Sequence, residues 1–226
     1  MKKTFLAINI ALITAVCIGN YFFITVGGRD IKAATSFGFV LIGIANLIYA
    51  VLKKSGKVKF AAAMAGGFVL AMLGDILINS NFIIGAGLFA LGHVAFAAAY
   101  CLLQKLKKLD IIVGGMLFAA TGSFVAFFPL LAFEEETLRF VCIAYALIIS
   151  MMVGKAAGNF IREKDITNML LLSGAVLFAV SDFMLVLAWF ADAGRWSDII
   201  CMATYYPAQC LLAHAVYHYI NKENNK

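Results

Sequence analysis

Eight long apolar runs divide this chain, and each has about the length that a helix needs to cross a bilayer. A hydrocarbon core about 30 Å thick requires roughly 20 apolar residues in a helix. The runs that we delimit are 5–26, 31–52, 59–78, 83–103, 110–131, 137–154, 167–190 and 197–220. Their connections are short, so helices that follow one another should be antiparallel neighbours. The pattern predicts an all-α fold, a polytopic membrane bundle of eight transmembrane helices in one integral membrane domain over residues 1–226.

The composition excludes an ordinary water-soluble domain. Of the 226 residues, 64% are apolar and 13% are charged, whereas soluble domains average about 45–50% apolar and about 25% charged residues. The net charge is +6, but the cations lie in short groups between the apolar runs, as topology signals do. Aromatic residues do not alternate with these groups, as single-strand binding would favour. We therefore predict a multi-pass integral membrane protein that does not bind nucleic acid.

Positive charge is divided unequally between the two sets of connections. Fourteen of the 18 Lys and Arg residues lie at the termini or near the connections after the second, fourth and sixth runs. The other four are Arg29, Lys32, Arg139 and Arg195. Cytoplasmic connections carry an excess of Lys and Arg. We therefore predict that both termini are cytoplasmic, in a membrane of the bacterial cytoplasmic type.

Two aspartates interrupt the apolar runs. Asp75 lies in Leu-Gly-Asp-Ile-Leu, and Asp182 lies in Val-Ser-Asp-Phe. An Asp deep in a transmembrane helix costs about 2.5–3.5 kcal/mol on insertion scales, so it must face a cavity or a partner. Ala63, Gly67 and Ala71 precede Asp75 at steps of four residues. This stripe of small residues predicts a packed interior helix face that ends in a carboxyl group.

Two interpretations of the aspartates stay open. In the first, each is a buried polar group tied to a Ser, Tyr or Lys for helix packing. In the second, both belong to one site in the outer half of the bundle; at 1.5 Å per residue, Asp75 lies roughly 5 Å and Asp182 roughly 12 Å from the outer helix ends. Two carboxyl groups in a low-dielectric pocket do not ionise together, so one stays protonated. Such a pair supplies an acid and a base.

Other polar side chains inside the runs are candidate binding residues. His93 lies near the middle of the fourth run. Tyr205 and Gln209 are four residues apart in the eighth run, so they share a helix face, and Pro207 between them frees a backbone carbonyl. Lys32 begins the second run, where it either contacts a phosphate or anchors the helix at the membrane surface.

A metal site is not expected. His214 and His218 have a spacing that can chelate a metal, but they lie toward the inner end of the eighth run, away from the aspartates. The only other histidine, His93, lies at a different depth. The sequence contains no glycine-rich phosphate loop, no Gly-x-Ser-x-Gly and no His-Glu-x-x-His. We therefore expect neither a metal nor another cofactor.

Four short stretches resemble the YhhN family of lysoplasmalogenase-like membrane proteins, and they occur in the order found in that family. The stretches are 73–77 (LGDIL), 87–96 (GLFALGHVAF), 174–182 (GAVLFAVSD) and 204–209 (TYYPAQ). Each is short, and their order is the specific part of the resemblance. One position departs from the family: Ala33 follows Lys32, where family members often have Pro.

The resemblance implies a lipid hydrolase that cleaves the vinyl ether bond of lysoplasmalogens. The products would be a fatty aldehyde and glycerophosphoethanolamine or glycerophosphocholine, so the partners would be a lysophospholipid substrate and membrane lipid. The family's two essential acids correspond to Asp75 and Asp182. The residues that we expect to bind the substrate or the reacting water are His93, Tyr205, Gln209 and Lys32.

Vinyl ether hydrolysis begins with protonation of the β-carbon and passes through an oxocarbenium ion. Our hypothesis makes Asp182 the acid and Asp75 the ionised partner, although the two roles could be reversed. Two other function classes stay open. One is a metal-dependent membrane lipid hydrolase that uses the three histidines, and the other is a proton-coupled transporter of an amphipathic solute. The sequence shows no clear inverted repeat, which weighs against the transporter, and it leaves the oligomeric state unknown.

Overall fold

The computed structural model describes residues 1–222 and contains eight α-helices and no strand in that range. The helices are α1 (Lys2–Val26), α2 (Arg29–Leu52), α3 (Val58–Leu77), α4 (Phe82–Leu103), α5 (Lys108–Phe127), α6 (Glu136–Arg162), α7 (Ile166–Phe190) and α8 (Arg195–Asn221). Each is long and apolar enough to cross a membrane. A helix satisfies its own backbone hydrogen bonds, which lipid cannot do. Eight such helices indicate a multi-pass membrane protein and confirm the predicted all-α fold.

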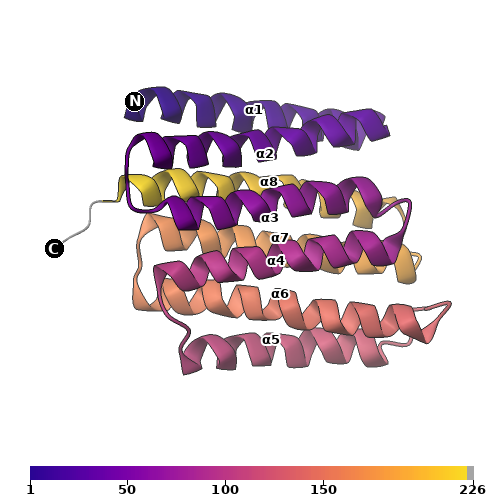
Figure 1. The fold of residues 1–226 in the computed structure, drawn as a ribbon. Coiled ribbons are helices and arrows are strands. Elements are labelled where there is room, and N and C mark those ends of the chain that lie inside the picture. The colour runs from indigo at the N-terminus through magenta and orange to yellow at the C-terminus, as the bar shows by residue number, and fades with distance from the viewer. Residues whose placement is uncertain (223–226) are drawn as a thin grey trace.

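Helices that follow one another run in opposite directions, so the beginning of α1 and the end of α8 lie at the same end of the bundle (Figure 1). In this view α3 and α4 lie in front of α8 and α7, and α1 and α5 form opposite edges. Helix α8 packs against α1, α2, α3 and α7, whereas α5 packs mainly against α6 and contacts α7 through the Phe124 and Phe183 rings, 5.0 Å apart. Helix α6 also packs against α4 and α7, and these contacts connect the α5–α6 pair to the other helices.

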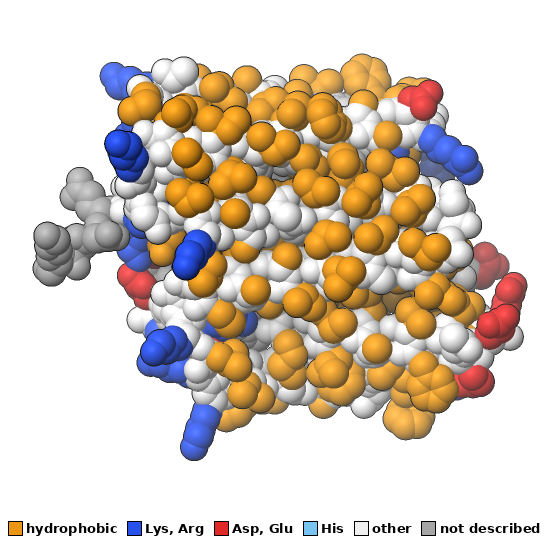
Figure 2. Space-filling model, in the orientation of Figure 1, with side chains coloured by type: hydrophobic (Ala, Val, Ile, Leu, Met, Phe, Trp, Pro, Cys, Tyr) orange, Lys and Arg blue, Asp and Glu red, His pale blue; other side chains and the backbone are white. Residues whose placement is uncertain are grey.

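The two ends of the bundle differ in charge (Figure 2). Lys and Arg side chains gather at the end that holds the N-terminus and the α2–α3, α4–α5 and α6–α7 connections, which we call the basic end. Acidic side chains gather at the opposite end, which we call the acidic end. Between them, hydrophobic side chains cover the face shown in Figure 2. This distribution suits a bundle whose middle faces lipid and whose ends face water.

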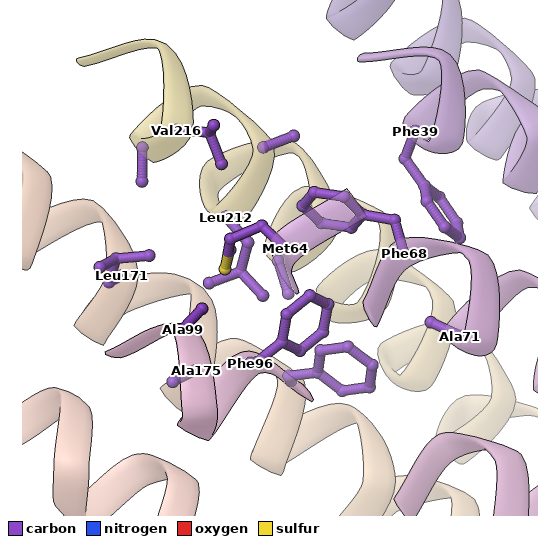
Figure 3. Packing of buried hydrophobic residues seen from close by; sticks show 14 of the residues in the cluster. Phe39, Met64, Phe68, Ala71, Phe96, Ala99, Leu171, Ala175, Leu212 and Val216 are labelled. Carbon is purple, nitrogen blue, oxygen red and sulfur yellow. The ribbon is translucent and has the colours of Figure 1, made fainter. Parts of the chain in front are cut away.

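The core consists of packed aromatic and aliphatic side chains, most of them from α2, α3, α4, α7 and α8, with further residues from α1 and α6 (Figure 3). Phe39, Phe68 and Phe96 are fully buried and lie in a row, with ring centroids 6.3 Å and 5.2 Å apart. A side chain at Gly67 would collide with the Phe96 ring. The predicted small-residue face of α3 is therefore buried, and it lets α4 approach closely.

Two predicted helix boundaries are wrong, and both have a physical reason. Helix α5 ends at Phe127 rather than at 131, because Phe128 precedes Pro129 and takes an extended conformation with φ −70° and ψ 118°. Helix α6 ends at Arg162 rather than at 154. Its last two turns carry Lys155 and Arg162, which we interpreted as part of a connection. In the structure both cations pair with Asp110 of α5.

Lys155, Arg162 and Asp110 form an ionic cluster between α5 and α6 at the basic end. Asp110 is 1% exposed, and its carboxylate pairs with Lys155, 3.2 Å away, and with Arg162. Lys155 also donates a hydrogen bond to Asn159, which donates in turn to the Tyr100 carbonyl oxygen at 3.0 Å. Lys155 and Arg162 share this one carboxylate, which compensates part of their charge and lets the helix continue through them.

Candidate active site

Asp75 lies in the last turn of α3, buried against α2 and α8. Its Oδ1 is 2.8 Å from Lys32 Nζ. Its Oδ2 accepts hydrogen bonds from the Ser36 hydroxyl and from the Tyr206 hydroxyl, the latter at 3.2 Å. Lys32 and Ser36 are four residues apart on α2 and therefore share a face. One cation and two hydroxyl donors therefore surround this carboxyl group.

Asp182 lies about two turns from the end of α7 and has a different set of partners. The Tyr145 hydroxyl donates a hydrogen bond to Asp182 Oδ2 at 2.7 Å, and His93 Nε2 is 3.1 Å from the same oxygen. His93 Nε2 is also 2.7 Å from the Tyr145 hydroxyl, so the three groups form a triangle. Within residues 1–222, no Lys or Arg pairs with Asp182. Asp182, His93 and Tyr145 therefore form one hydrogen-bonded network.

Both aspartates line one small cavity, which we call the carboxyl cavity. Its volume is about 20 Å³, and its wall includes Lys32, Ser181 and Tyr205. A buried water needs roughly 10–15 Å³ of such space and at least two polar partners. The carboxyl cavity therefore has room for one water molecule between the two acids.

A larger cavity of about 370 Å³ opens at the acidic end, and we call it the vestibule. It is lined by the ends of α1, α3 and α7 and by the beginnings of α2 and α8. The vestibule and the carboxyl cavity share Lys32, Ile78, Leu185, Cys201 and Met202 as wall residues. The carboxyl pair is therefore separated from the end of the bundle by single side chains.

Two apolar crevices reach Asp182 from other directions. One of about 20 Å³ lies between α4, α6 and α7, and one of about 60 Å³ lies between α5, α6 and α7. Asp182 and Tyr145 line both crevices. Ile78 and Leu185 line the first crevice, the vestibule and the carboxyl cavity. The site thus meets a polar space on one side and hydrocarbon-like space on the other.

The other predicted site residues lie at different distances from the two aspartates. Tyr205 lines the carboxyl cavity, but its hydroxyl donates to the Ala71 carbonyl oxygen at 3.4 Å rather than to either Asp. Gln209 is fully buried and is not part of the cavity wall. Neither polar atom of its side-chain amide has a hydrogen-bond partner within residues 1–222. The structure thus brings Lys32, His93 and Tyr205 to the aspartates and places Gln209 one turn farther along α8.

Three residues that contact the aspartates escaped the sequence analysis: Ser36, Tyr145 and Tyr206. A signal existed for two of them, because Ser36 follows Lys32 by four residues and Tyr206 is next to Tyr205. Tyr145 stands alone among apolar residues of α6, and only the packing of α6 against α4 and α7 reveals its role.

The histidines do not gather around one point. His214 and His218 approach each other, with 3.2 Å between their Nε2 atoms, whereas His93 belongs to the Asp182 triangle. Within residues 1–222 no group of three or more His, Cys, Asp or Glu side chains could hold a metal ion. A metal site that uses all three histidines therefore has no geometric support.

Comparison with curated proteins gives short matches only. Polyamine aminopropyltransferases 1 and 2 of Ralstonia nicotianae are each 34% identical to this chain over 95 residues. The match covers 40% of this chain, and the chain spans only 18% of the length of each of those proteins. No solved structure matches the chain.

The match to a protein family is much longer. Residues 35–216 match the YhhN family, a range that runs from α2 into α8 and includes both aspartates and their partners His93, Tyr145 and Tyr206. Lys32 lies just before the matched range. Because the match covers most of the chain, this protein belongs to the YhhN family.

Proposed function

We propose that this protein is a membrane-embedded hydrolase that cleaves the vinyl ether bond of lysoplasmalogens through Asp182 and Asp75. The observation that supports this most is the water-sized carboxyl cavity between two acids in different environments. Lys32 pairs with Asp75, whereas Tyr145 and His93 surround Asp182. Hydrolysis of a vinyl ether needs one proton donor, one proton acceptor and one water, and this arrangement offers all three. Membership of the YhhN family is consistent with a hydrolase.

The first step is proton transfer to carbon. Asp182 gives its proton to the β-carbon of the vinyl ether, and the electron pair of the double bond forms the new C–H bond. The α-carbon becomes an oxocarbenium ion, which the Asp182 and Asp75 carboxylates stabilise. Tyr145 donates to the Asp182 oxygen, which stabilises the carboxylate that the transfer leaves behind.

Water and the second carboxylate complete the reaction. The water oxygen bonds to the α-carbon, and its proton passes to Asp75, which gives a hemiacetal. Asp75 then returns that proton to the ether oxygen, while Asp182 takes the hemiacetal hydroxyl proton. The C–O bond breaks, and a fatty aldehyde and a glycerol hydroxyl leave. Both acids end in their starting states, so the cycle consumes only one water.

An amphipathic substrate suits the surroundings of the site. Its head group would occupy the vestibule, and its hydrocarbon chain would enter one of the apolar crevices beside Asp182. The excess of Lys and Arg at the basic end would place the termini in the cytoplasm. The vestibule would then face the outer side of a membrane of the bacterial cytoplasmic type. Lys32 and Tyr205 would contact the glycerol oxygens, and the Gln209 amide would hold water next to Tyr205.

The test is product analysis with the full-length protein in lipid nanodiscs. A 1-alkenyl lysophosphoethanolamine should yield a fatty aldehyde and glycerophosphoethanolamine, measured by mass spectrometry. In D₂O the aldehyde should carry one deuterium at C2, because the proton on that carbon comes from an exchangeable acid. A 1-acyl lysophosphoethanolamine should remain intact. Release of a fatty acid from the acyl lipid, or no aldehyde from the alkenyl lipid, would refute the proposal.

Leu185 provides a test of the route into the site. It separates the vestibule, the carboxyl cavity and one crevice, so Leu185→Trp should obstruct all three. The larger Trp ring should hinder the passage of substrate, and we expect kcat/KM to fall at least about tenfold, or about 1.4 kcal/mol in activation free energy. Val180→Trp is the matched control, because Val180 lies on the same helix but is 37% exposed. Equal kinetics for the two variants would show that substrate does not pass Leu185.

A further inference from the structure

Two charges in the vestibule lack an ionic partner. Arg195 and Asp198 are three residues apart at the start of α8, and both line the vestibule. Within residues 1–222, neither forms an ion pair with the other or with any other side chain. Lys32 also lines the vestibule, but Asp75 neutralises its charge. The vestibule thus presents one uncompensated cation and one uncompensated anion to its contents.

The cationic side of the vestibule suits a phosphate. A guanidinium group presents a planar set of donors that matches phosphate oxygens. Arg195 is also the first residue of α8, where unpaired backbone N–H groups add partial positive charge. The preceding Gly194 provides no side chain to cap these groups. Arg195 and the N-terminus of α8 therefore both attract an anion.

The anionic side suits an ammonium group. Asp198 supplies a carboxylate, and Trp189 from the end of α7 supplies an indole ring that is 43% exposed. Cations bind over the face of a Trp ring, and quaternary ammonium groups are recognised in this way. The vestibule volume of about 370 Å³ also lies in the range of small-molecule sites, roughly 300–1,000 Å³.

We propose that the vestibule is a binding subsite for a zwitterionic phosphate ester, with Arg195 on the phosphate and with Asp198 and Trp189 on the ammonium group. The inference rests on the proposed function, because the shared wall residues place the ester next to the carboxyl cavity. The subsite would select among lipid head groups, which Asp75 and Asp182 do not contact in the proposed function. Asp198 repels a head group with an uncompensated negative charge, so the subsite selects choline or ethanolamine esters over anionic ones.

The experiment measures binding rather than turnover. The probes are two lysolipids with the same saturated 1-O-alkyl chain, which cannot undergo vinyl ether hydrolysis; one carries phosphocholine and the other phosphoglycerol. Titration calorimetry on the nanodisc-embedded protein gives the dissociation constants. Arg195→Gln should weaken both lipids about tenfold, because each loses a charge-assisted hydrogen bond. Asp198→Asn should weaken the phosphocholine lipid about fivefold and leave the phosphoglycerol lipid unchanged or more tightly bound.

Two charge changes at the same end of the bundle serve as controls. Arg139→Gln and Asp192→Asn remove the same charges from residues that do not line the vestibule, so neither should alter binding of either probe. A melting temperature for each variant shows that it is folded. The subsite is refuted if Asp198→Asn affects both lipids alike, or if Arg195→Gln binds them as the wild type does.

The subsite and the hydrolase can fail separately. If the saturated probes bind with the expected selectivity but no aldehyde forms from the alkenyl lipid, the subsite stands and the proposed function falls. If aldehyde forms and the Arg195 and Asp198 variants bind both probes normally, the function stands and the subsite falls.

Discussion

Asp182→Asn should lower kcat for aldehyde release by about a thousandfold, because a general acid contributes about 10²–10⁴-fold to the rate. Asn has the shape of Asp and can still accept the hydrogen bond from Tyr145, but it has no acidic proton for the β-carbon. Substrate binding depends on the vestibule and the crevices, so KM should change little. Steady-state kinetics with an alkenyl lysolipid at saturating and limiting concentrations separate the two effects.

Two further variants complete this test. Asp192→Asn alters an exposed carboxyl group outside the site and should keep the wild-type kcat. Asp75→Asn should also abolish turnover, but it leaves the Lys32 ammonium group without its partner. The double variant Asp75→Asn with Lys32→Met removes both charges and should be as inactive as Asp75→Asn alone. If hydrolysis persists in Asp182→Asn and in Asp75→Asn, the carboxyl mechanism is wrong.

Asp110→Asn should lower the free energy of unfolding by about 3–5 kcal/mol, the usual cost of removing one partner from a buried ion pair. The substitution leaves the charges of Lys155 and Arg162 without an anion, and the Lys155 side chain is only 2% exposed. The amide oxygen of Asn can still accept the hydrogen bond from the Lys107 N–H. Unfolding in mixed detergent micelles, followed by circular dichroism, measures the change.

Asp165 offers a matched comparison at the same end of the bundle. Its carboxylate pairs with Lys222 at 2.6 Å, but both side chains are partly exposed. Such pairs contribute about 0–1 kcal/mol, and Asn at this position can still cap α7. Asp165→Asn should therefore reduce stability by less than about 1 kcal/mol. Equal losses for the two variants would show that burial of the Asp110 cluster does not govern its energetics.

The helical architecture was predictable because lipid imposes a length and a composition on every span. The apolar runs gave eight helices, and most of their boundaries agree with the structure within three residues. The end of α6 was missed because Lys155 and Arg162 look like a connection until their partner on α5 is known. A transmembrane helix can contain a charged side chain when that side chain has an ionic partner. The partner lies on another helix, so the sequence of one apolar run does not reveal it.

The candidate site was predictable in part for the same reason. Asp75 and Asp182 stand out in a single run because each carries a cost in lipid. Tyr145 does not, since a tyrosine in an apolar helix costs little and is commonly an ordinary packing residue. Gln209 was expected to bind the substrate or the reacting water because it shares a helix face with Tyr205, yet it lies outside the carboxyl cavity wall. Gln209 shares a helix face with the cavity residue Tyr205 but lies one turn farther along α8, whereas the role of Tyr145 depends on which helices pack against α6.

The position of α5 at one edge of the bundle, mainly against α6, has a consequence for how the protein enters the membrane. Because α5 packs mainly against α6, the helix next to it in the chain, the two helices can leave the insertion machinery as one hairpin. Asp110, Lys155 and Arg162 then enter the membrane as one ion-paired cluster rather than as three separate charges without partners, which a membrane disfavours. Such a preformed pair would meet the other helices through the contacts of α6 with α4 and α7 and through the contact of Phe124 on α5 with Phe183 on α7.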